Sequence, residues 1–301
     1  MSSTTTAAAP PARPLPAGVP GDPDAYYRAL TERNRGLIPD AVQQRLRTAT
    51  VLVAGCGSTG GAVVEPLARL GMGRFVLAEP GEYELNNLNR QSARYADIGR
   101  NKAEVAAERV RAVNPFAETR VDTAGVRPDD AGPLLDGVDA VVDGVDVTTV
   151  SGWRAKYALH VESARRGLPV ISGYDLSGTQ HVRYYDYRTE PVPLAGVITE
   201  ADIVERALWT LLLKVIPREI VPADLIADVQ AHRSEPEYSV PQLVYASDQF
   251  GVLAARYVVE ILAGRPVREQ ITVDVHRLVS ADTDRPAAHL ESTHRAQDKE
   301  S

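Results

Sequence analysis

Cysteine is nearly absent from this sequence, and so are long apolar runs and any excess of basic residues. Cys56 is the only cysteine among 301 residues, which excludes an internal disulfide framework and a zinc site built from cysteine pairs. The longest apolar run, residues 208–216, is interrupted by Lys214 and is too short to span a bilayer. The net charge of -7 argues against general nucleic-acid binding, which requires a basic surface.

The first 22 residues have neither the basic segment nor the apolar segment of a secretory signal. Because they are rich in Ser, Thr, Ala and Pro, we expect them to be disordered. Residues 281–301 are polar and charged and predict a tail. Between these ends, residues 23–280 contain enough apolar residues for one folded domain, and we expect a cytoplasmic protein.

Strand-like and helix-like patterns alternate along residues 23–280. Strands are expected at 50–54, 74–79, 138–143 and 169–172, and helices at 60–70, 101–113 and 153–166. This order predicts an α/β fold with a Rossmann-like, doubly wound and mostly parallel sheet. Added antiparallel strands are expected at 181–187 and 270–275, and further helices at 24–35, 40–46, 200–215 and 249–263. Residues 216–245 contain four prolines and little periodicity, so they predict a long crossover loop of functional importance.

The segment VLVAGCGSTGG, residues 51–61, has the spacing G-x-G-x-x-G between a predicted strand and a predicted helix. Its glycines, Gly55, Gly57 and Gly60, allow a tight turn and close approach to a phosphate, which the helix N-terminus then attracts. Glu79 ends the next strand, about 20 residues further on, where an acid can bind ribose hydroxyls. A tight turn without a ligand is the alternative. Cys56 is interpreted as a small buried side chain rather than a catalytic thiol.

Three later segments favour ATP over NAD: EPGEYELNNLNRQ (79–91), DIGRNKAEVAAERVRAVNP (97–115) and DAVVDGVD (139–146). Arg90 and Lys102 can neutralise a triphosphate, and Asp146, just after a predicted strand, can hold Mg²⁺. A hydride-transfer enzyme does not require an arginine, a lysine and an aspartate around one nucleotide. The alternatives are a surface ion pair for Arg90, a structural role for Lys102 and a helix cap for Asp146.

With these motifs the sequence resembles the ThiF/MoeB/HesA family, the prokaryotic relatives of ubiquitin-activating enzymes. The resemblance covers residues 33–173 and, more weakly, 248–275. It implies ATP and Mg²⁺ as cofactors, a homodimer, ribose binding by Glu79 and metal binding by Asp146. The residues that it places along the phosphates are Asn87, Arg90, Gln91 and Lys102. In the segment ERNRGL, residues 32–37, Arg33 would reach ATP in the partner subunit, with Arg35 as the alternative.

The sequence departs from the family pattern at several positions. Ser58 stands where the loop usually has its fourth glycine, Glu79 and Gly81 stand where the family has Asp-x-Asp, and Val147 replaces the usual Asn. No cysteine follows Gly57, so a thioester on a later cysteine is excluded, as are the family's zinc-binding cysteine pairs.

The resemblance implies attack of a substrate carboxylate on the α-phosphate of ATP, giving an acyl-adenylate and pyrophosphate. A carboxylate is already ionised at neutral pH and needs no general base, so positioning and charge from Arg33, Arg90, Lys102 and Mg²⁺ would suffice. The acyl group would then pass directly to an external nucleophile. The substrate would be a small molecule or a peptide or protein C-terminus, with Tyr174 and Asp175 as candidate contacts.

Three other functions remain open at this point. The first is adenylation of a ubiquitin-like sulfur-carrier protein, and the second is a non-catalytic scaffold subunit. The third is an NAD-dependent oxidoreductase, which the charged residues around the loop disfavour.

Overall fold

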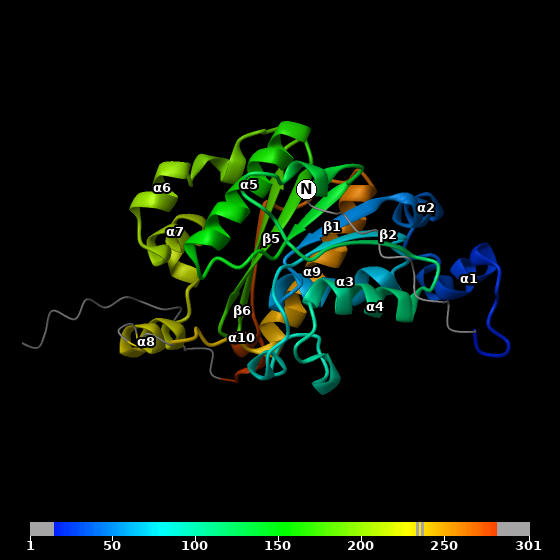
Figure 1. The fold of residues 1–301 in the computed structure, drawn as a ribbon, viewed down its shortest axis with the longest axis horizontal. Helices are drawn as coiled ribbons and strands as arrows, with labels where there is room; N and C mark the ends of the chain where they lie inside the picture. Colours follow the sequence, from blue (N-terminus) through cyan, green and yellow to red (C-terminus); the bar gives the residue numbers. More distant parts are fainter. Residues whose placement is uncertain (1–14, 233–234, 236–237, 282–301) are drawn as a thin grey trace, which may run out of the picture.

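The computed structural model describes residues 15–232, 235 and 238–281, and in them one seven-stranded sheet has helices on both faces (Figure 1). The strand order is β3-β2-β1-β4-β5-β6-β7. The strands are β1 (Thr50–Ala54), β2 (Arg74–Ala78), β3 (Glu118–Asp122), β4 (Ala140–Asp143), β5 (Pro169–Leu176), β6 (Thr179–Asp186) and β7 (Gln270–Asp274). Strands β1 to β5 are parallel, whereas β6 and β7 are antiparallel additions. The predicted fold class is confirmed.

The helices within the described residues form the outer layers. They are α1 (Pro23–Leu30), α2 (Asp40–Thr48), α3 (Ser58–Arg69), α4 (Lys102–Val113), α5 (Val150–Arg166), α6 (Glu200–Glu205), α7 (Leu208–Val215), α8 (Ala223–His232), α9 (Val244–Leu262) and α10 (Val275–Val279). Figure 1 shows α6, α7 and α8 at one end of the molecule and α1 and α2 at the other. The described residues contain no helix long and apolar enough to cross a membrane.

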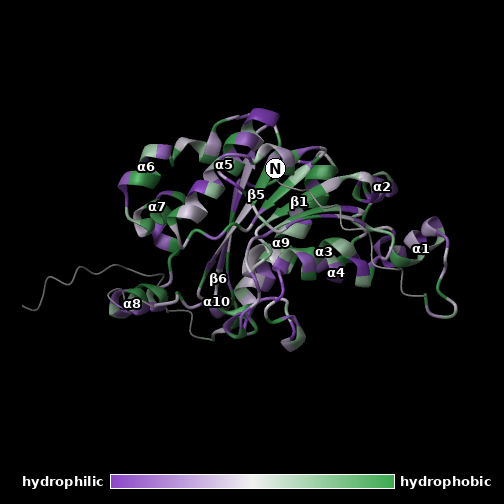
Figure 2. Ribbon diagram, viewed as in Figure 1, coloured by the Kyte–Doolittle hydropathy of each residue, from purple (hydrophilic) through white to green (hydrophobic). Residues whose placement is uncertain are grey.

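The sheet separates two hydrophobic cores because successive side chains of a strand point to opposite faces. In β1, Val51 and Val53 pack with residues of α2, α3, α4 and α9, whereas Leu52 and Ala54 pack with residues of α5 to α8. Figure 2 shows the central strands in the hydrophobic colour and α2 as largely hydrophilic. The central parallel strands β1, β2 and β4 are therefore mostly apolar, as expected for strands that are covered on both faces.

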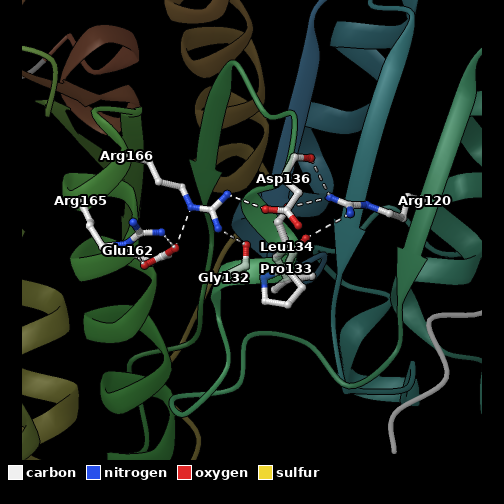
Figure 3. A network of polar contacts seen from close by, with 8 residues as sticks. All are labelled: Arg120, Gly132, Pro133, Leu134, Asp136, Glu162, Arg165 and Arg166. Carbon is white, nitrogen blue, oxygen red and sulfur yellow. Dashed lines mark hydrogen bonds and ion pairs between the residues drawn. The ribbon is translucent and has the colours of Figure 1, made fainter.

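Helix α5 has clear end signals and a polar attachment to the sheet. The Thr149 side chain accepts from the Gly152 N–H at its start, and Gly167 at its end has a positive φ of 65°. Figure 3 shows how Arg166 joins this helix to the loop before β4: its guanidinium donates to Glu162, to Asp136 and to the Gly132 carbonyl. The α5 helix is therefore fixed to the sheet at the end remote from its first turn.

Three segments differ from the sequence-based expectations. Strand β3 is missing from the sequence-based expectations because its residues, ETRVD, are mostly polar. In the structure the first of them is exposed and the other four are half-buried. The helix expected at 200–215 is two helices, α6 and α7, with extended backbone at Arg206 and Ala207 between them. The segment 216–245 was expected to be a loop, but it contains α8 and the first residues of α9. The expected disordered segment and polar tail lie mostly outside the described residues.

Candidate active site

A cavity of about 880 Å³ lies at the carboxyl ends of β1, β4 and β5. Residues 57–59 after β1, 144–148 after β4 and 173–176 at the end of β5 line it. The strand order changes direction between β1 and β4, and open α/β sheets bind ligands in the crevice outside this point. The position and size of the cavity are therefore those of a ligand site.

The glycine loop connects β1 to α3 by backbone-to-backbone packing. Gly55 has a φ of 82°, and a Cβ placed on it would lie 2.3 Å from the Gly144 carbonyl oxygen. A Cβ on Gly60 would lie 1.9 Å from the Gly55 carbonyl oxygen. Only glycine fits at these two positions, which shape the loop without lining the cavity.

Gly57 faces the cavity and caps the N-terminus of α3. The nearest atoms to a Cβ on Gly57 belong to the Gln91 side chain, at 3.8 Å or more. The Gln91 amide is buried, and its Oε1 atom has no hydrogen-bond partner in the described residues. Because a glutamine side chain has both an NH₂ group and a carbonyl oxygen and can turn over to exchange them, Gln91 can present either a donor or an acceptor beside the helix N-terminus. An anion at this point would meet both groups.

Glu79 holds the loop from the neighbouring strand. Its carboxylate accepts from the Cys56 N–H at 2.9 Å and from the Gly81 N–H at 2.8 Å. The side chain also lines the cavity. Asn87 lines the cavity too, but its amide is already bonded to the Glu84 N–H and to the Asn86 side chain.

Arg90 lies in the cavity wall with neutral hydrogen-bond partners. Its guanidinium donates to the Gln242 side chain, to the Asn86 carbonyl and to the Asn89 side chain. Burial lowers the pKa of Arg90, while the charges of Asp175 and Asp146 act to raise it. Its positive charge is thus left without a direct ion pair among the described residues and is available to an anion.

Lys102 is the first residue of α4, and the preceding Asn101 caps that helix through its side chain. The Lys102 ammonium lies 5.8 Å from the centroid of the Tyr83 ring and lines the cavity. Within the described residues, no carboxylate forms a salt bridge with it. Because a lysine in the first turn opposes the helix dipole, a bound anion would relieve this arrangement.

Asp146 lies in the cavity wall after β4. Its two carboxylate oxygens accept from the Thr148 N–H at 2.8 Å and from the Thr148 hydroxyl at 2.9 Å. The cap of the following helix is Thr149, not Asp146. The carboxylate is held in place by neutral donors, which leaves its charge uncompensated by any cation in contact with it among the described residues.

Asp175, named from the sequence with Tyr174 as a candidate contact, lines the same cavity at the end of β5. Its Oδ2 atom accepts from Ser58 at 3.1 Å and from Ser247 of α9 at 3.0 Å. Its Oδ1 atom is buried without a partner in the described residues. Burial raises the pKa of Asp175 against the opposing effect of these hydroxyl groups. The serine that replaces the loop's fourth glycine therefore supports this buried carboxyl group.

Like Gly55 and Gly60, the predicted Arg33 and its alternative Arg35 do not line the cavity, and neither does Cys56. Arg33 is exposed in a short 3-10 turn, and Arg35, also exposed, follows it. Cys56 is fully buried, and its Sγ atom contacts the Val53 carbonyl oxygen. Burial raises the pKa of the Cys56 thiol well above its ordinary value, so it is an unreactive core side chain.

The part of the cavity that lies outside the predicted nucleotide motifs could not be predicted in detail from the sequence. Its wall is mainly apolar and comes from the end of β5, from α7 and α8 and from the segment before α9, with Tyr238 and Ser239 as polar members. The apolar side chains are Leu176, Leu208, Trp209, Leu212, Leu225, Val240 and Pro241. Gln242, which bonds to Arg90, also comes from this region. No local motif marks Gln242. The apolar character of 208–216 was visible in the sequence, but its position beside the site depends on the tertiary fold.

Comparison with known proteins finds relatives that share part of this sequence. The tRNA threonylcarbamoyladenosine dehydratase of Haemophilus influenzae is 40% identical over 93 residues, 31% of this chain and 35% of that protein. The sulfur carrier protein adenylyltransferase of Thermus thermophilus is 37% identical over 105 residues, 35% of this chain and 37% of that protein. The matched stretches span about a third of the length of these curated relatives.

Solved structures show the same fold. The tRNA N6-threonylcarbamoyladenosine dehydratase of E. coli has a TM-score of 0.58 at 24% identity, covering 80% of this chain and 96% of that chain. E. coli MccB with ATP has a TM-score of 0.54 at 17% identity, covering 83% of this chain and 66% of that chain. The model of the ThiF family matches residues 31–265, most of the sequence. This chain therefore belongs to the ThiF family.

Proposed function

We propose that this chain is an ATP-dependent adenylyltransferase that activates a carboxylate as an acyl-adenylate. The observation that carries the proposal is the convergence of three anion-binding features on one cavity. The N-terminus of α3, Arg90 and Lys102 all face it, and neither side chain has a carboxylate in contact within the described residues. The curated Thermus relative, whose name is that of an adenylyltransferase, supports the same activity.

The residues of the cavity fit ATP better than a dinucleotide. Positive charge is concentrated where a triphosphate would lie, and the unpartnered Gln91 amide offers a further polar contact beside Gly57. We assign the ribose hydroxyls to Glu79, which directly follows β2 and lines the cavity, although two backbone N–H groups already bond to its carboxylate. Lys102 and Arg90 would stabilise the charge that builds on the α-phosphate during attack by the substrate carboxylate.

Asp146 is the residue that we propose for Mg²⁺. Magnesium bound with nucleotides commonly uses one or two protein carboxylates together with phosphate oxygens and water. Asp146 fits this role because it lines the cavity and, in the described part of the chain, its carboxylate accepts hydrogen bonds from Thr148 alone. When bound, the ion would neutralise phosphate charge.

The second half-reaction follows from the position of the only cysteine. Cys56 is buried, so the acyl group has no accessible thiol of this chain to which it could pass. We propose direct transfer to an external nucleophile: the new bond forms to the acyl carbon, the carbon–oxygen bond to AMP breaks, and AMP leaves. In a sulfur-carrier pathway that nucleophile would be supplied by another protein.

The test is ATP–pyrophosphate exchange with Mg²⁺, using a panel of carboxylic acids, a fractionated metabolite extract and a sulfur-carrier protein as separate substrates. Exchange is expected with one of these and should fall at least about a hundredfold in Lys102→Met and Asp146→Asn. Arg69→Met is the matched control, because Arg69 is exposed, lies outside the cavity and forms its salt bridge, among the described residues, with Glu65. Unchanged exchange in both variants would overturn the proposal. Tight ATP binding without exchange would favour the scaffold alternative.

We further propose a homodimer in which Arg33, or Arg35, completes the site of the partner subunit. Both arginines are exposed and lie outside the cavity of their own subunit. Arg33→Ala and Lys102→Met chains should each be inactive alone. Because a mixed dimer would keep one intact site of two, and half of the dimers in an equal mixture are mixed, the mixture should recover up to about a quarter of wild-type exchange activity. No recovery, with mixed dimers confirmed by mass spectrometry, would contradict this assignment.

A further inference from the structure

The cavity has two chemically different halves. One half carries Glu79, Arg90, Lys102 and Asp146, which the proposed function assigns to ATP. The other half is lined by Leu176, residues of α7 and α8, and residues 238–241. No charged side chain from these segments lines it in the described part of the chain. Asp175 and Arg90 lie where the two halves meet. The charge of Asp175 acts to raise the pKa of Arg90, and the charge of Arg90 acts to lower the pKa of Asp175.

Helix α7 is apolar around most of its circumference. Leu211 and Val215 are buried in the core beneath it, while Leu208, Trp209 and Leu212 face the cavity. Trp209 is 38% exposed, an unusual state for a large aromatic side chain. Leu208 and Leu212 are also partly buried against this core, whereas Trp209 is not part of it. Core packing therefore leaves the exposed Trp209 side chain, and the sides of Leu208 and Leu212 that line the cavity, without a structural explanation.

The apolar wall is held firmly in position. Ser177, in the turn between β5 and β6, donates to Asp224 of α8 at 3.0 Å and pairs through its backbone with Gln242. Asp202 of α6 binds Lys214 of α7 at 2.9 Å. These contacts fix α7, α8 and residues 238–242 around the cavity, so the apolar surface is part of a preformed site rather than a loose segment.

We propose that the substrate of this site is a carboxylic acid whose body, adjacent to the carboxylate, is aliphatic or aromatic. This inference rests on the proposed carboxylate activation and adds the chemical class of the substrate. The carboxylate would lie at the boundary near Arg90, next to the phosphates, and the apolar body would lie against Trp209, Leu212, Leu225 and Val240. A charged body would lose its hydration there without gaining a partner, so the wall also rejects acids such as succinate.

A free acid and the C-terminal residue of a peptide share this chemistry. The segment 238–242 pairs with the β5–β6 turn through a single bridge, between Ser177 and Gln242. Leu176 at the end of β5 and residues 238–242 both line the cavity. Free acids and short peptides with apolar C-terminal residues therefore form separate arms of the test.

Binding is tested without nucleotide by the fluorescence of Trp209 and by calorimetry, with cyclohexylacetate and succinate as probes. The chain has only two tryptophans, and Trp153 is fully buried, so a ligand-dependent shift reports Trp209. Cyclohexylacetate should shift the emission to shorter wavelength, and succinate should not. The Trp209→Phe variant should lose the shift but retain the heat of binding. Gly-Gly-Leu and Gly-Gly-Asp form the peptide arm.

Two variants test the wall from opposite sides. Leu212→Ser in α7 and Val240→Ser in the segment 238–242 should each weaken cyclohexylacetate binding about tenfold, because each removes an apolar contact. Val204→Ser, an exposed valine of α6 outside the cavity, should leave the affinity unchanged. Circular dichroism confirms that each variant is folded.

The outcomes separate this inference from the proposed function. Equal binding of succinate and cyclohexylacetate, or full affinity in both wall variants, would overturn the apolar substrate class. Pyrophosphate exchange with a polar acid would do the same while leaving adenylation intact. Selective binding of cyclohexylacetate without exchange for any acid would uphold the apolar site and contradict adenylation. Binding of Gly-Gly-Leu but not of cyclohexylacetate would identify a peptide C-terminus as the source of the apolar acid.

Discussion

Gly57 and Gly60 are three residues apart, yet an added methyl group would meet very different surroundings at each. At Gly60 the nearest backbone oxygen would be 1.9 Å away, whereas at Gly57 only the Gln91 side chain approaches, at 3.8 Å. The first position is closed by the chain's own backbone. The second is open toward the cavity, where we place a phosphate.

We predict opposite effects of alanine at these two positions. Gly60→Ala should lower the free energy of unfolding by about 3 kcal/mol or more, because the β1–α3 packing must shift. Gly57→Ala should change it by less than about 1 kcal/mol but should weaken ATP binding, because the methyl group occupies the space beside the helix N-terminus. Urea denaturation and calorimetry measure the two quantities. Normal ATP affinity in Gly57→Ala would contradict the phosphate position.

More of the cavity residues were named from the sequence in the proposed nucleotide half than in the proposed substrate half. Arg90, Lys102 and Asp146 belong to local motifs that follow strands, and the carboxyl ends of parallel strands meet at one edge of the sheet. Gln242 lies 152 residues beyond Arg90, and only the tertiary fold brings their side chains together. Asp175 was a candidate, but its support by Ser58 and Ser247 could not be read from spacing.

At the scale of elements, the position of α5 depends on Arg166. Its side chain makes hydrogen bonds to Glu162, Asp136 and the Gly132 carbonyl, while the neighbouring Arg165 binds the same Glu162 (Figure 3). The hydrogen bond from Arg165, with that from Arg166, lowers the pKa of Glu162 to about 2 against the effect of burial. Arg120 of β3 donates to the carbonyls of Pro133 and Leu134 on the other side of the same loop.

We predict that Arg166→Met lowers the free energy of unfolding by about 1–2 kcal/mol, because it leaves the Gly132 carbonyl and two carboxylates without this donor. ATP affinity should not change, since none of these residues lines the cavity. Arg154→Met, at an exposed arginine of the same helix, is the control and should be nearly neutral. Similar stability of the two variants would show that this network does not hold α5.

The predicted elements failed where tertiary contacts decide the outcome. Asp202 binds both Arg206 and Lys214, which brings α7 back against α6 although no glycine or proline interrupts residues 200–215. In the expected loop, Pro222 directly precedes α8, so it marks the start of this helix without interrupting it. That signal was present, but the other prolines of the segment concealed it. Strand β3 forms by pairing with β2 at the sheet edge, without the apolar pattern of a covered strand.

At the scale of the whole molecule, two buried histidines make stability depend on pH. His160 bonds to Asp143 and Tyr187, and His181 bonds to Thr272. Burial lowers the pKa of His160 below its ordinary value, and burial with the charge of Arg183 lowers the pKa of His181 to about 4. The Asp143 carboxylate also stays charged, because Lys156 and His160 outweigh the effect of burial and hold its pKa low.

We predict that the free energy of unfolding falls as pH decreases from about 6.5 to 4. In this window the unfolded chain binds protons at histidine whereas the folded chain does not, so each such residue contributes a slope of up to about 1.4 kcal/mol per pH unit. His181→Gln should reduce the slope. His232→Gln should not, because a hydrogen bond to the Asp228 carbonyl raises the pKa of His232. An unchanged slope in His181→Gln would contradict the prediction.

The turn between β5 and β6 has a consequence for how new specificities arise. Ser177 in this turn donates to Asp224 of α8 and pairs through its backbone with Gln242. A single residue of the turn therefore contacts both α8 and the segment 238–242 of the apolar wall. We therefore expect that the stretch between Arg206 and Gln242 can be exchanged for another sequence while the nucleotide-binding residues stay unchanged. Grafting another ThiF-family segment here, with Ser177, Asp224 and Gln242 retained, should transplant acid preference in one step.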